Sequence, residues 1–280
     1  MTTVLSMNEV LPLTCTRLGT CCHDKQVWLN PWELASMAHA RGLAARDFRE
    51  QFTDHGIRLR FAGACSQYDS ASGCVAHAGR PLACRLYPLG REKRGVAVRY
   101  VHEGRRFPCL AGCPTVVELP RLSVGDYLAG QGVGPGEIAQ DTYLEMAQDL
   151  AEGAFVVLFE SGLAQLRGNA VFDRWRDLVD GDAAKRITAI GEQWLDQLTV
   201  PVFEAELDEP ATWIAAHRAA FQRTAQTSFG ALRDEADLAD ASVRFFALAL
   251  HLLQAVGADP ATPGRQWLAA ARQRLSKPST

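Results

Sequence analysis

Apolar residues recur at three- and four-residue intervals through the second half of the chain, which is the spacing of one face of an α-helix. Gly and Pro residues interrupt this pattern between successive segments. Six helices are therefore predicted, over residues 137–163, 173–179, 183–198, 209–229, 237–256 and 263–275. The sequence thus predicts a C-terminal helical bundle.

The first part of the chain has shorter and more varied patterns. Asn30-Pro31-Trp32-Glu33 supplies an N-cap residue, a proline at the first helical position and a glutamate three residues after the cap, and the predicted helix ends at about Arg41. Residues 65–88 carry few regular signals. Further elements are predicted as a helix over 45–52 and strands over 57–61 and 96–101. The expected fold is mainly α, with a small α+β, loop-rich N-terminal region ahead of the helical bundle.

Charge and composition change near residue 119. Residues 1–119 hold 15 Lys and Arg against 10 Asp and Glu, whereas residues 120–280 hold 14 against 22, so the two parts carry formal charges of +5 and -8. Pro114 and Pro120 interrupt local structure at this change. We expect a first domain over 1–119 and a helical domain over 120–280.

All eight cysteines fall before residue 114, and none lies in the remaining 167 residues. The N-terminus carries no Lys or Arg before Arg17 and so lacks the charged start of a secretory signal, which leads us to expect a cytoplasmic protein. Because a reducing cytosol keeps ordinary thiols unpaired, the clustering favours metal ligation or thiol redox chemistry over disulfides. The first domain is therefore predicted to be a cysteine-cluster metal-binding domain.

The spacing of the cysteines does not by itself identify the metal. Adjacent Cys21 and Cys22 would strain the peptide if they bonded to each other, whereas two neighbouring thiolates can ligate one metal or two. Their spacing from the preceding cysteine differs from zinc fingers and from the usual ferredoxin run. His23 directly follows this pair and His77 lies three residues after Cys74, so each imidazole is a candidate ligand, and the alternative is a solvent-facing side chain or one that hydrogen-bonds to a ligand.

The cysteine motifs occur in a fixed order: a single cysteine, a Cys-Cys pair, a C-x8-C pair, and the motif Arg80-Pro81-Leu-Ala-Cys84-Arg85 followed by Pro88. This order resembles the YkgJ-type cysteine-cluster family of zinc- or iron-chelating domains. The resemblance covers about residues 13–114. It implies a cluster of six cysteines with two additional ligands, namely Cys15, Cys21, Cys22, Cys65, Cys74 and Cys84, with Cys109 and Cys113 as the additional two. Many members carry a further cysteine where this chain has Leu18, so Cys109, Cys113 or a nearby histidine would have to replace it.

Eight thiolates exceed what one four-coordinate site needs, so two metals, or one iron-sulfur cluster with spare redox-active thiols, are both open. Between Arg80 and Arg106 lie eight basic residues and two acidic ones. This positive charge would neutralise a thiolate-rich cluster or receive an anionic partner, and a solvated basic hairpin is the alternative. An iron-sulfur cluster is the preferred cofactor and zinc the alternative.

The predicted function is that of a cytosolic metalloprotein whose metal has a structural or redox role, with an unidentified protein or small-molecule partner. Flagellin lysine N-methylases are similar to the family in their cysteine pattern, which implies protein lysine N-methylation as an alternative, and a thiol redox sensor is a third possibility. No GxGxxG, Walker lysine loop, HExxH or GxSxG motif is present in the sequence, and whether the protein is an enzyme stays open.

Two kinds of partner are not expected. The net charge of -3 lacks the positive excess that is typical of nucleic-acid binding. The longest apolar run, over residues 245–256, is interrupted by His251 and is too short to cross a bilayer, so we expect no membrane association.

Overall fold

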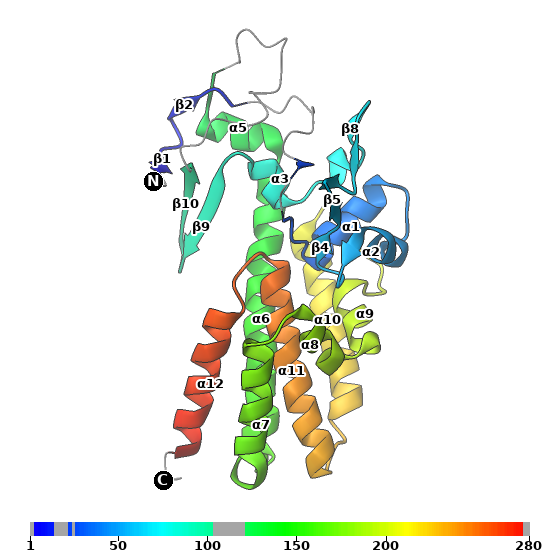
Figure 1. Cartoon of the computed structure of the whole chain (residues 1–280), viewed down its shortest axis with the longest axis vertical. Helices are drawn as coiled ribbons and strands as arrows, with labels where there is room; N and C mark the ends of the chain where they lie inside the picture. The colour runs from blue at the N-terminus through cyan, green and yellow to red at the C-terminus, as the bar shows by residue number, and fades with distance from the viewer. Residues whose placement is uncertain (1–2, 14–21, 24–25, 103–120, 277–280) are drawn as a thin grey trace. The chain divides into compact units, whose positions relative to one another are not determined.

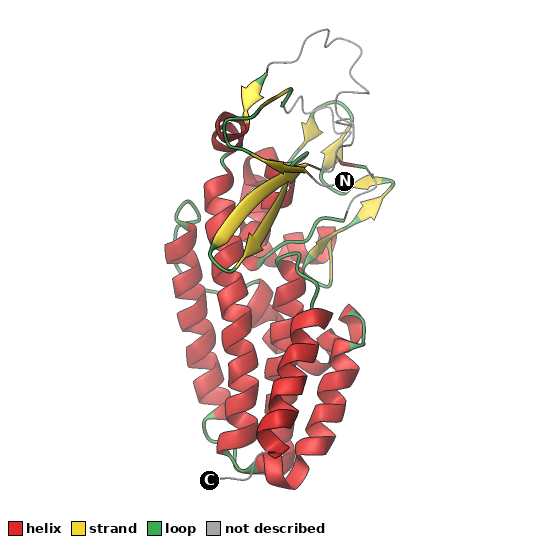
Figure 2. Ribbon diagram, turned by 90° about the vertical axis from the view of Figure 1, so that its left-hand side faces the viewer, coloured by secondary structure: helices red, strands yellow, loops and turns green. Residues whose placement is uncertain are grey.

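The computed structural model describes residues 3–13, 22–23, 26–102 and 121–276 (Figure 1). Helices dominate these ranges, and the strands, drawn in yellow in Figure 2, are short. The expected mainly helical fold, with small sheets in the N-terminal region and helices after it, is confirmed. The predicted domain boundary at 119/120 lies outside the described residues and stays a prediction.

The described chain forms two compact units. The first comprises the residues up to Val27, Glu33–Asp54 and Arg58–Ile138, and the second comprises Trp28–Trp32, His55–Ile57 and the residues from Ala139 on. Each unit therefore includes segments that are far apart in the sequence.

The first unit contains the strands, which pair antiparallel in small sheets. β1, β10 and β9 form a three-stranded sheet in that order, with Thr3 opposite His102 and Tyr100 opposite Arg91. The other pairs are β2 with β11, β3 with β4, β5 with β6 and β7 with β8. The strands are β1 (Thr3–Leu5), β2 (Val10–Leu11), β3 (Thr53–Asp54), β4 (Arg58–Leu59), β5 (Phe61–Ala62), β6 (Ala64–Cys65), β7 (Tyr68–Asp69), β8 (Gly73–Cys74), β9 (Gly90–Arg94), β10 (Ala97–His102) and β11 (Leu122–Ser123).

Short helices complete the first unit and bury its core. They are α1 (Pro31–Ala40), α2 (Ala45–Phe52), the 3-10 helix η2 (His77–Gly79), α3 (Leu82–Leu86) and α5 (Val124–Gln131). α1 and α2 confirm the two helices predicted for this region. Leu82, Leu86 and Leu89 pack with Val124 and Tyr127 in a buried cluster, so the segment around α3 is held by apolar contacts as well as by hydrogen bonds.

The predicted strand over 57–61 is wrong as a single element. β4 and β5 belong to different hairpins, because Leu59 lies opposite Thr53 whereas Phe61 lies opposite Cys65. Between them, the backbone N–H of Arg60 donates to the carbonyl of Phe52 at 2.9 Å. An alternating apolar pattern cannot reveal such a change of partner, because it records only which face a side chain occupies.

The second unit is mainly helical, and α6 begins in the first unit and continues into the second. The helices are α6 (Val133–Glu160), α7 (Leu163–Val179), α8 (Ala183–Ile190), α9 (Glu192–Thr199), α10 (Pro210–Phe229), α11 (Glu235–Ala255) and α12 (Ala261–Ser276). The predicted helix over 183–198 is wrong as one helix, because Gly191 has φ 79° and separates α8 from α9. The predicted helix over 173–179 is the last part of α7.

α11 is the central helix of the second unit. It packs against α7 and α8, and α12 packs against α7 (Figure 1). The Phe246 ring stacks on Trp175 with centroids 4.4 Å apart, and the apolar run of α11 is buried among the other helices. No helix in the described ranges combines the length and the apolar character needed to cross a membrane.

Candidate metal centre

Cys22 and His23 lie beside the hairpin that carries Cys65. His23 forms an antiparallel β-bridge with Ala64, the residue that precedes Cys65 in β6. The His23 ring also lies edge-on to Tyr68, with ring centroids 5.2 Å apart. This bridge brings two cysteine-bearing segments together although more than forty residues separate them in the sequence.

Cys65 occupies a buried position in β6 and receives a hydrogen bond on its sulfur. Only 9% of the residue is exposed, and it lies opposite Phe61 in the β5–β6 hairpin. The backbone N–H of Gln67 donates to the Cys65 Sγ at 3.5 Å. An N–H group directed at sulfur stabilises the thiolate, which is the form that ligates metals.

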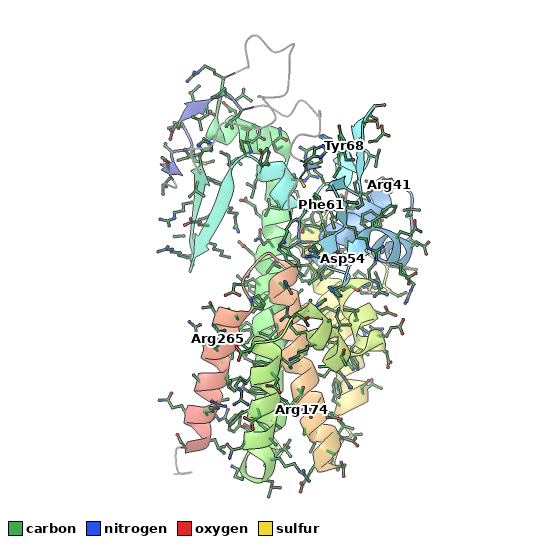
Figure 3. The ribbon with its side chains drawn as sticks, in the orientation of Figure 1. Arg41, Asp54, Phe61, Tyr68, Arg174 and Arg265 are labelled. Atoms are coloured by element: carbon green, nitrogen blue, oxygen red, sulfur yellow. The ribbon has the colours of Figure 1, made fainter. Side chains whose placement is uncertain are left out.

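Gln67 connects the Cys65 segment to the Cys74 segment. Its carbonyl accepts a hydrogen bond from the N–H of Val75 at 2.9 Å, directly after Cys74. Its side chain is buried, with 1% of the residue exposed, and its Oε1 accepts from Arg41 Nη1 at 2.5 Å. Arg41, which follows α1, thereby holds the loop between the two cysteines. Figure 3 labels Arg41 and Tyr68, the residue after Gln67.

The β7–β8 hairpin places Cys74 opposite Tyr68. Its turn is closed by Asp69, whose Oδ1 accepts hydrogen bonds from the N–H of Ala71 at 3.0 Å and from the N–H and hydroxyl of Ser72, each at 2.8 Å. The Ser72 hydroxyl, followed by the two N–H groups, lowers the pKa of the Asp69 carboxyl. The Asp69 carboxylate therefore stabilises the turn of the β7–β8 hairpin.

Cys84 lies in α3, and both α3 and the preceding η2 make a close contact with α1. The Oε1 of Glu33 accepts from the N–H of Leu82, the first residue of α3, at 2.7 Å. Gly79 lies so close to α1 that an added Cβ would come within 2.1 Å of the Ser36 carbonyl oxygen. α1 therefore contacts the segment that carries Cys84, and Arg41, the residue after α1, contacts the segment that carries Cys65.

Arg85 shapes the loop in front of Cys84. Its guanidinium donates to three backbone carbonyls, those of Arg80 at 2.8 Å, Gln131 at 2.9 Å and Ala78 at 2.8 Å. Burial, followed by the charge of Arg80, lowers the pKa of Arg85, while Glu33 and the Cys84 thiolate oppose that shift. The guanidinium remains charged at neutral pH, because an arginine pKa starts near the top of the scale.

The two candidate histidines differ in their contacts. His77 Nδ1 lies 2.9 Å from Arg80 Nη1, and the same guanidinium nitrogen also contacts Nε2. His23 Nδ1 instead lies 3.1 Å from the carbonyl oxygen of Gly63. A guanidinium only donates and a carbonyl only accepts, so the two rings meet opposite hydrogen-bonding partners.

Four of the predicted ligands lie in the described ranges, and backbone pairing relates three of their segments, those of Cys22, Cys65 and Cys74. Cys84 is placed separately through α3. Among the described residues, no three His, Cys, Asp or Glu side chains form a group able to hold a metal ion. The other predicted ligands lie outside those residues, namely Cys15, Cys21, Cys109 and Cys113.

The donor atoms offered here suit both zinc and iron. Thiolate sulfur is a preferred ligand of Zn2+ and of iron-sulfur clusters, and imidazole nitrogen binds either metal. The hydrogen bond to Cys65 Sγ and the charge of Arg85 beside Cys84 both favour thiolates over thiols. Sequence reasoning did not identify Gln67, and it named Glu33 and Arg41 only for their places in a helix, because neither spacing nor residue type reveals partners so distant in the chain.

Residues 14–101 match the CxxCxxCC family, which is described as a "putative zinc- or iron-chelating domain". The matched segment contains six of the eight cysteines and ends before Cys109 and Cys113. The match agrees with the cysteine-cluster family that the sequence resembles, and it supports metal chelation by this segment. No curated protein and no solved structure matches the chain.

Proposed function

We propose that the N-terminal region binds an iron-sulfur cluster through its cysteines, with zinc as the alternative metal. The observation that carries this proposal is the backbone pairing around Cys65, which joins its hairpin to the Cys22–His23 segment and, through Gln67, to the segment after Cys74. All three of these segments carry a cysteine, so the pairing brings thiol-bearing stretches of backbone together.

Two features support iron-sulfur over a single zinc ion. The chain has eight cysteines, twice the number that one four-coordinate zinc site uses. Arg80 lies four residues before Cys84 and Arg85 directly follows it, and their positive charge would offset the negative charge of a thiolate-ligated cluster. A bound cluster would supply electron transfer or a covalent cross-link between the loops.

The chain's own residues define what surrounds such a group. Gln67 supplies an N–H to the Cys65 sulfur, and Arg41 fixes Gln67 through its side chain. Glu33 and Arg85 fix the loop and helix that carry Cys84. The proposal places the protein in a reducing compartment, where these thiols stay available, and assigns recognition of a partner or substrate to the acidic helical region.

The visible spectrum of the full chain, purified without oxygen, tests this assignment. An iron-sulfur cluster gives a brown protein with broad absorption that bleaches on reduction, together with iron and acid-labile sulfide in equal amounts. A colourless protein that contains zinc would show that the bound metal is zinc and not an iron-sulfur cluster, and metal chelation by the region would stand. A folded, fully reduced protein that takes up neither metal would overturn the proposal.

A further inference from the structure

We propose that the helical unit binds a small zwitterion with an apolar body, of the class of the hydrophobic α-amino acids. The site is a pocket of about 200 Å³ between α6, α10 and α11, and all the residues that line it belong to the second unit. This inference rests on the part of the proposed function that assigns recognition to the helical region, and it does not depend on which metal the first unit binds.

The inner wall of the pocket is apolar. Met146 and Leu150 of α6 and Phe221 of α10 line it, and all three are buried. Phe245 of α11 completes the wall, and its ring lies against α6, where a Cβ added to Gly153 would come within 3.3 Å of it. Pockets of this kind, lined by aromatic and aliphatic side chains between the helices of a bundle, are characteristic of small-molecule sites.

The volume of the pocket sets the size of the ligand. A dry apolar cavity of about 150 Å³ holds a benzene molecule. A pocket of about 200 Å³ therefore has room for a phenyl ring or a branched aliphatic side chain together with a short polar group. The rings of Phe221 and Phe245 favour an aromatic body, because aromatic pairs gain from edge-to-face and offset stacking beyond the area that they bury.

An ion pair marks the mouth of the pocket. Arg218 of α10 donates from its Nη2 to Oδ2 of Asp149 in α6, and both residues line the pocket. The two side chains are 36% and 42% exposed, whereas Met146, Leu150 and Phe221 are buried. The charged groups therefore face the entrance, and the apolar groups form the interior.

Each member of this pair can hold a second partner. A guanidinium has five N–H donors, of which the contact with Asp149 uses one, and a carboxylate has two oxygens that accept. A monoanion would gain Arg218 and be repelled by Asp149, and a monocation would meet the reverse. An α-amino acid carries both charges on one carbon atom. It can place its carboxylate on Arg218, its ammonium on Asp149 and its side chain against the apolar wall.

NMR of carbon-13-labelled methionine methyl groups in the full chain tests the proposal. The four methionines are Met1, Met7, Met37 and Met146, and only the last lies in the second unit. L-Phenylalanine is the probe, and it is expected to shift the Met146 resonance in a saturable way and to leave those of Met7 and Met37 in place. N-Acetyl-phenylalanine, a monoanion, and phenylalanine amide, a monocation, are expected to bind about tenfold more weakly or worse, because each lacks one charged hydrogen bond.

Two variants make the result specific to this pocket. Arg218→Gln removes the partner of the ligand carboxylate, and we expect it to bind L-phenylalanine about tenfold more weakly or worse. Arg174→Gln is the matched control, because it breaks an ion pair between α7 and α11 that does not line the pocket, and it is expected to bind like the wild type.

Three results would overturn the inference. They are a Met146 resonance that stays in place up to the solubility limit of L-phenylalanine, equal affinity of the wild type for the three compounds, and unchanged binding by Arg218→Gln. The comparison of the three compounds uses the wild type alone, so it holds even if a variant does not fold. Each of these results would leave the metal assignment standing, because the visible spectrum tests that assignment separately.

Discussion

Glu33 in the first turn of α1 accepts a hydrogen bond from the N–H of Leu82, at the start of the helix that carries Cys84. The carboxylate is buried, with 4% of the residue exposed, and it satisfies a backbone donor that α3 cannot satisfy internally. A negative charge at this end of a helix is also favourable. The position of the Cys84 segment therefore depends on a residue 49 positions earlier in the chain.

Glu33→Ala is expected to lower the free energy of unfolding by about 1–3 kcal/mol, because it leaves the buried N–H of Leu82 without its acceptor. Glu33→Gln retains an acceptor oxygen and is expected to lower the free energy of unfolding by less than the alanine variant does. Urea denaturation of the full chain measures both variants. Equal stability of the alanine variant and the wild type would show that this hydrogen bond does not hold α3.

Gly79→Ala tests the close approach of η2 to α1. The new Cβ would lie 2.1 Å from the Ser36 carbonyl oxygen, and the backbone must move to relieve the clash. We expect a loss of about 1–3 kcal/mol in the free energy of unfolding, together with weaker metal binding because the Cys84 loop shifts. Gly130→Ala in α5 is the matched control, since its Cβ meets nothing within 4 Å and helical alanine is favoured over glycine. A Gly79→Ala protein as stable as Gly130→Ala would contradict this packing.

Gln67→Ala is expected to expose Cys65. The substitution removes the side-chain oxygen that accepts from Arg41. Residue 67 is then held less firmly, although its backbone N–H contacts the Cys65 sulfur and its carbonyl accepts from the N–H of Val75. In metal-free protein, the rate at which iodoacetamide alkylates Cys65 should rise about fivefold or more, as the local opening free energy falls by about 1 kcal/mol or more. Mass spectrometry of the Cys65 peptide measures this rate.

Gln67→Glu is the control for that experiment, because a carboxylate still accepts from Arg41. Its alkylation rate should stay close to that of the wild type. If the alanine variant is alkylated no faster than the glutamate variant, the Arg41–Gln67 hydrogen bond does not restrict the loop.

The buried His217 makes the stability of the helical unit depend on pH. Its Nδ1 accepts from the Tyr143 hydroxyl at 2.8 Å, and its Nε2 donates to the Gln197 carbonyl at 3.0 Å. Burial lowers the pKa of His217 from 6.5 to about 4, although the hydrogen bond to Gln197 opposes the shift. As the pH falls below 6.5, the unfolded chain binds a proton that the folded chain does not bind, so the free energy of unfolding decreases.

Between pH 7 and pH 5 this histidine should remove about 2 kcal/mol of stability. His217→Gln cannot titrate, so its unfolding free energy, measured by urea denaturation at each pH, should fall less steeply over this interval. Most carboxylates stay ionised there, and the comparison with the variant subtracts the contribution of the other histidines, including the buried His251, whose pKa burial lowers to about 3. Parallel pH profiles for the variant and the wild type would mean that His217 has an ordinary pKa.

Local signals predicted α1 and α2 at their observed places. For α1 these signals are Asn30-Pro31 at the start and Gly42 after the end, because helix ends depend on neighbours a few residues apart. The break between α8 and α9 was missed although Gly191 marks it, since a glycine within a helical pattern is often tolerated.

The candidate site shows where sequence reasoning stops. Cysteine and histidine are recognisable as donors by residue type, so Cys65, Cys74, Cys84 and His23 could all be named in advance. Gln67 could not, because its contribution depends on Arg41, 26 residues away in sequence, and on a backbone N–H that every residue but proline has. Likewise, only the folded chain determines that a carbonyl meets the His23 ring and a guanidinium meets the His77 ring.

The central claim is that cysteines from distant segments bind zinc or iron together, and metal content per chain tests it most directly. The wild type, Cys65→Ser, Cys84→Ser and the helical-unit control Trp213→Phe should be purified without oxygen and analysed for zinc and iron. We expect metal in the wild type and in Trp213→Phe, and its loss from both serine variants. Equal metal in all four proteins, or no metal in the wild type, would contradict the account.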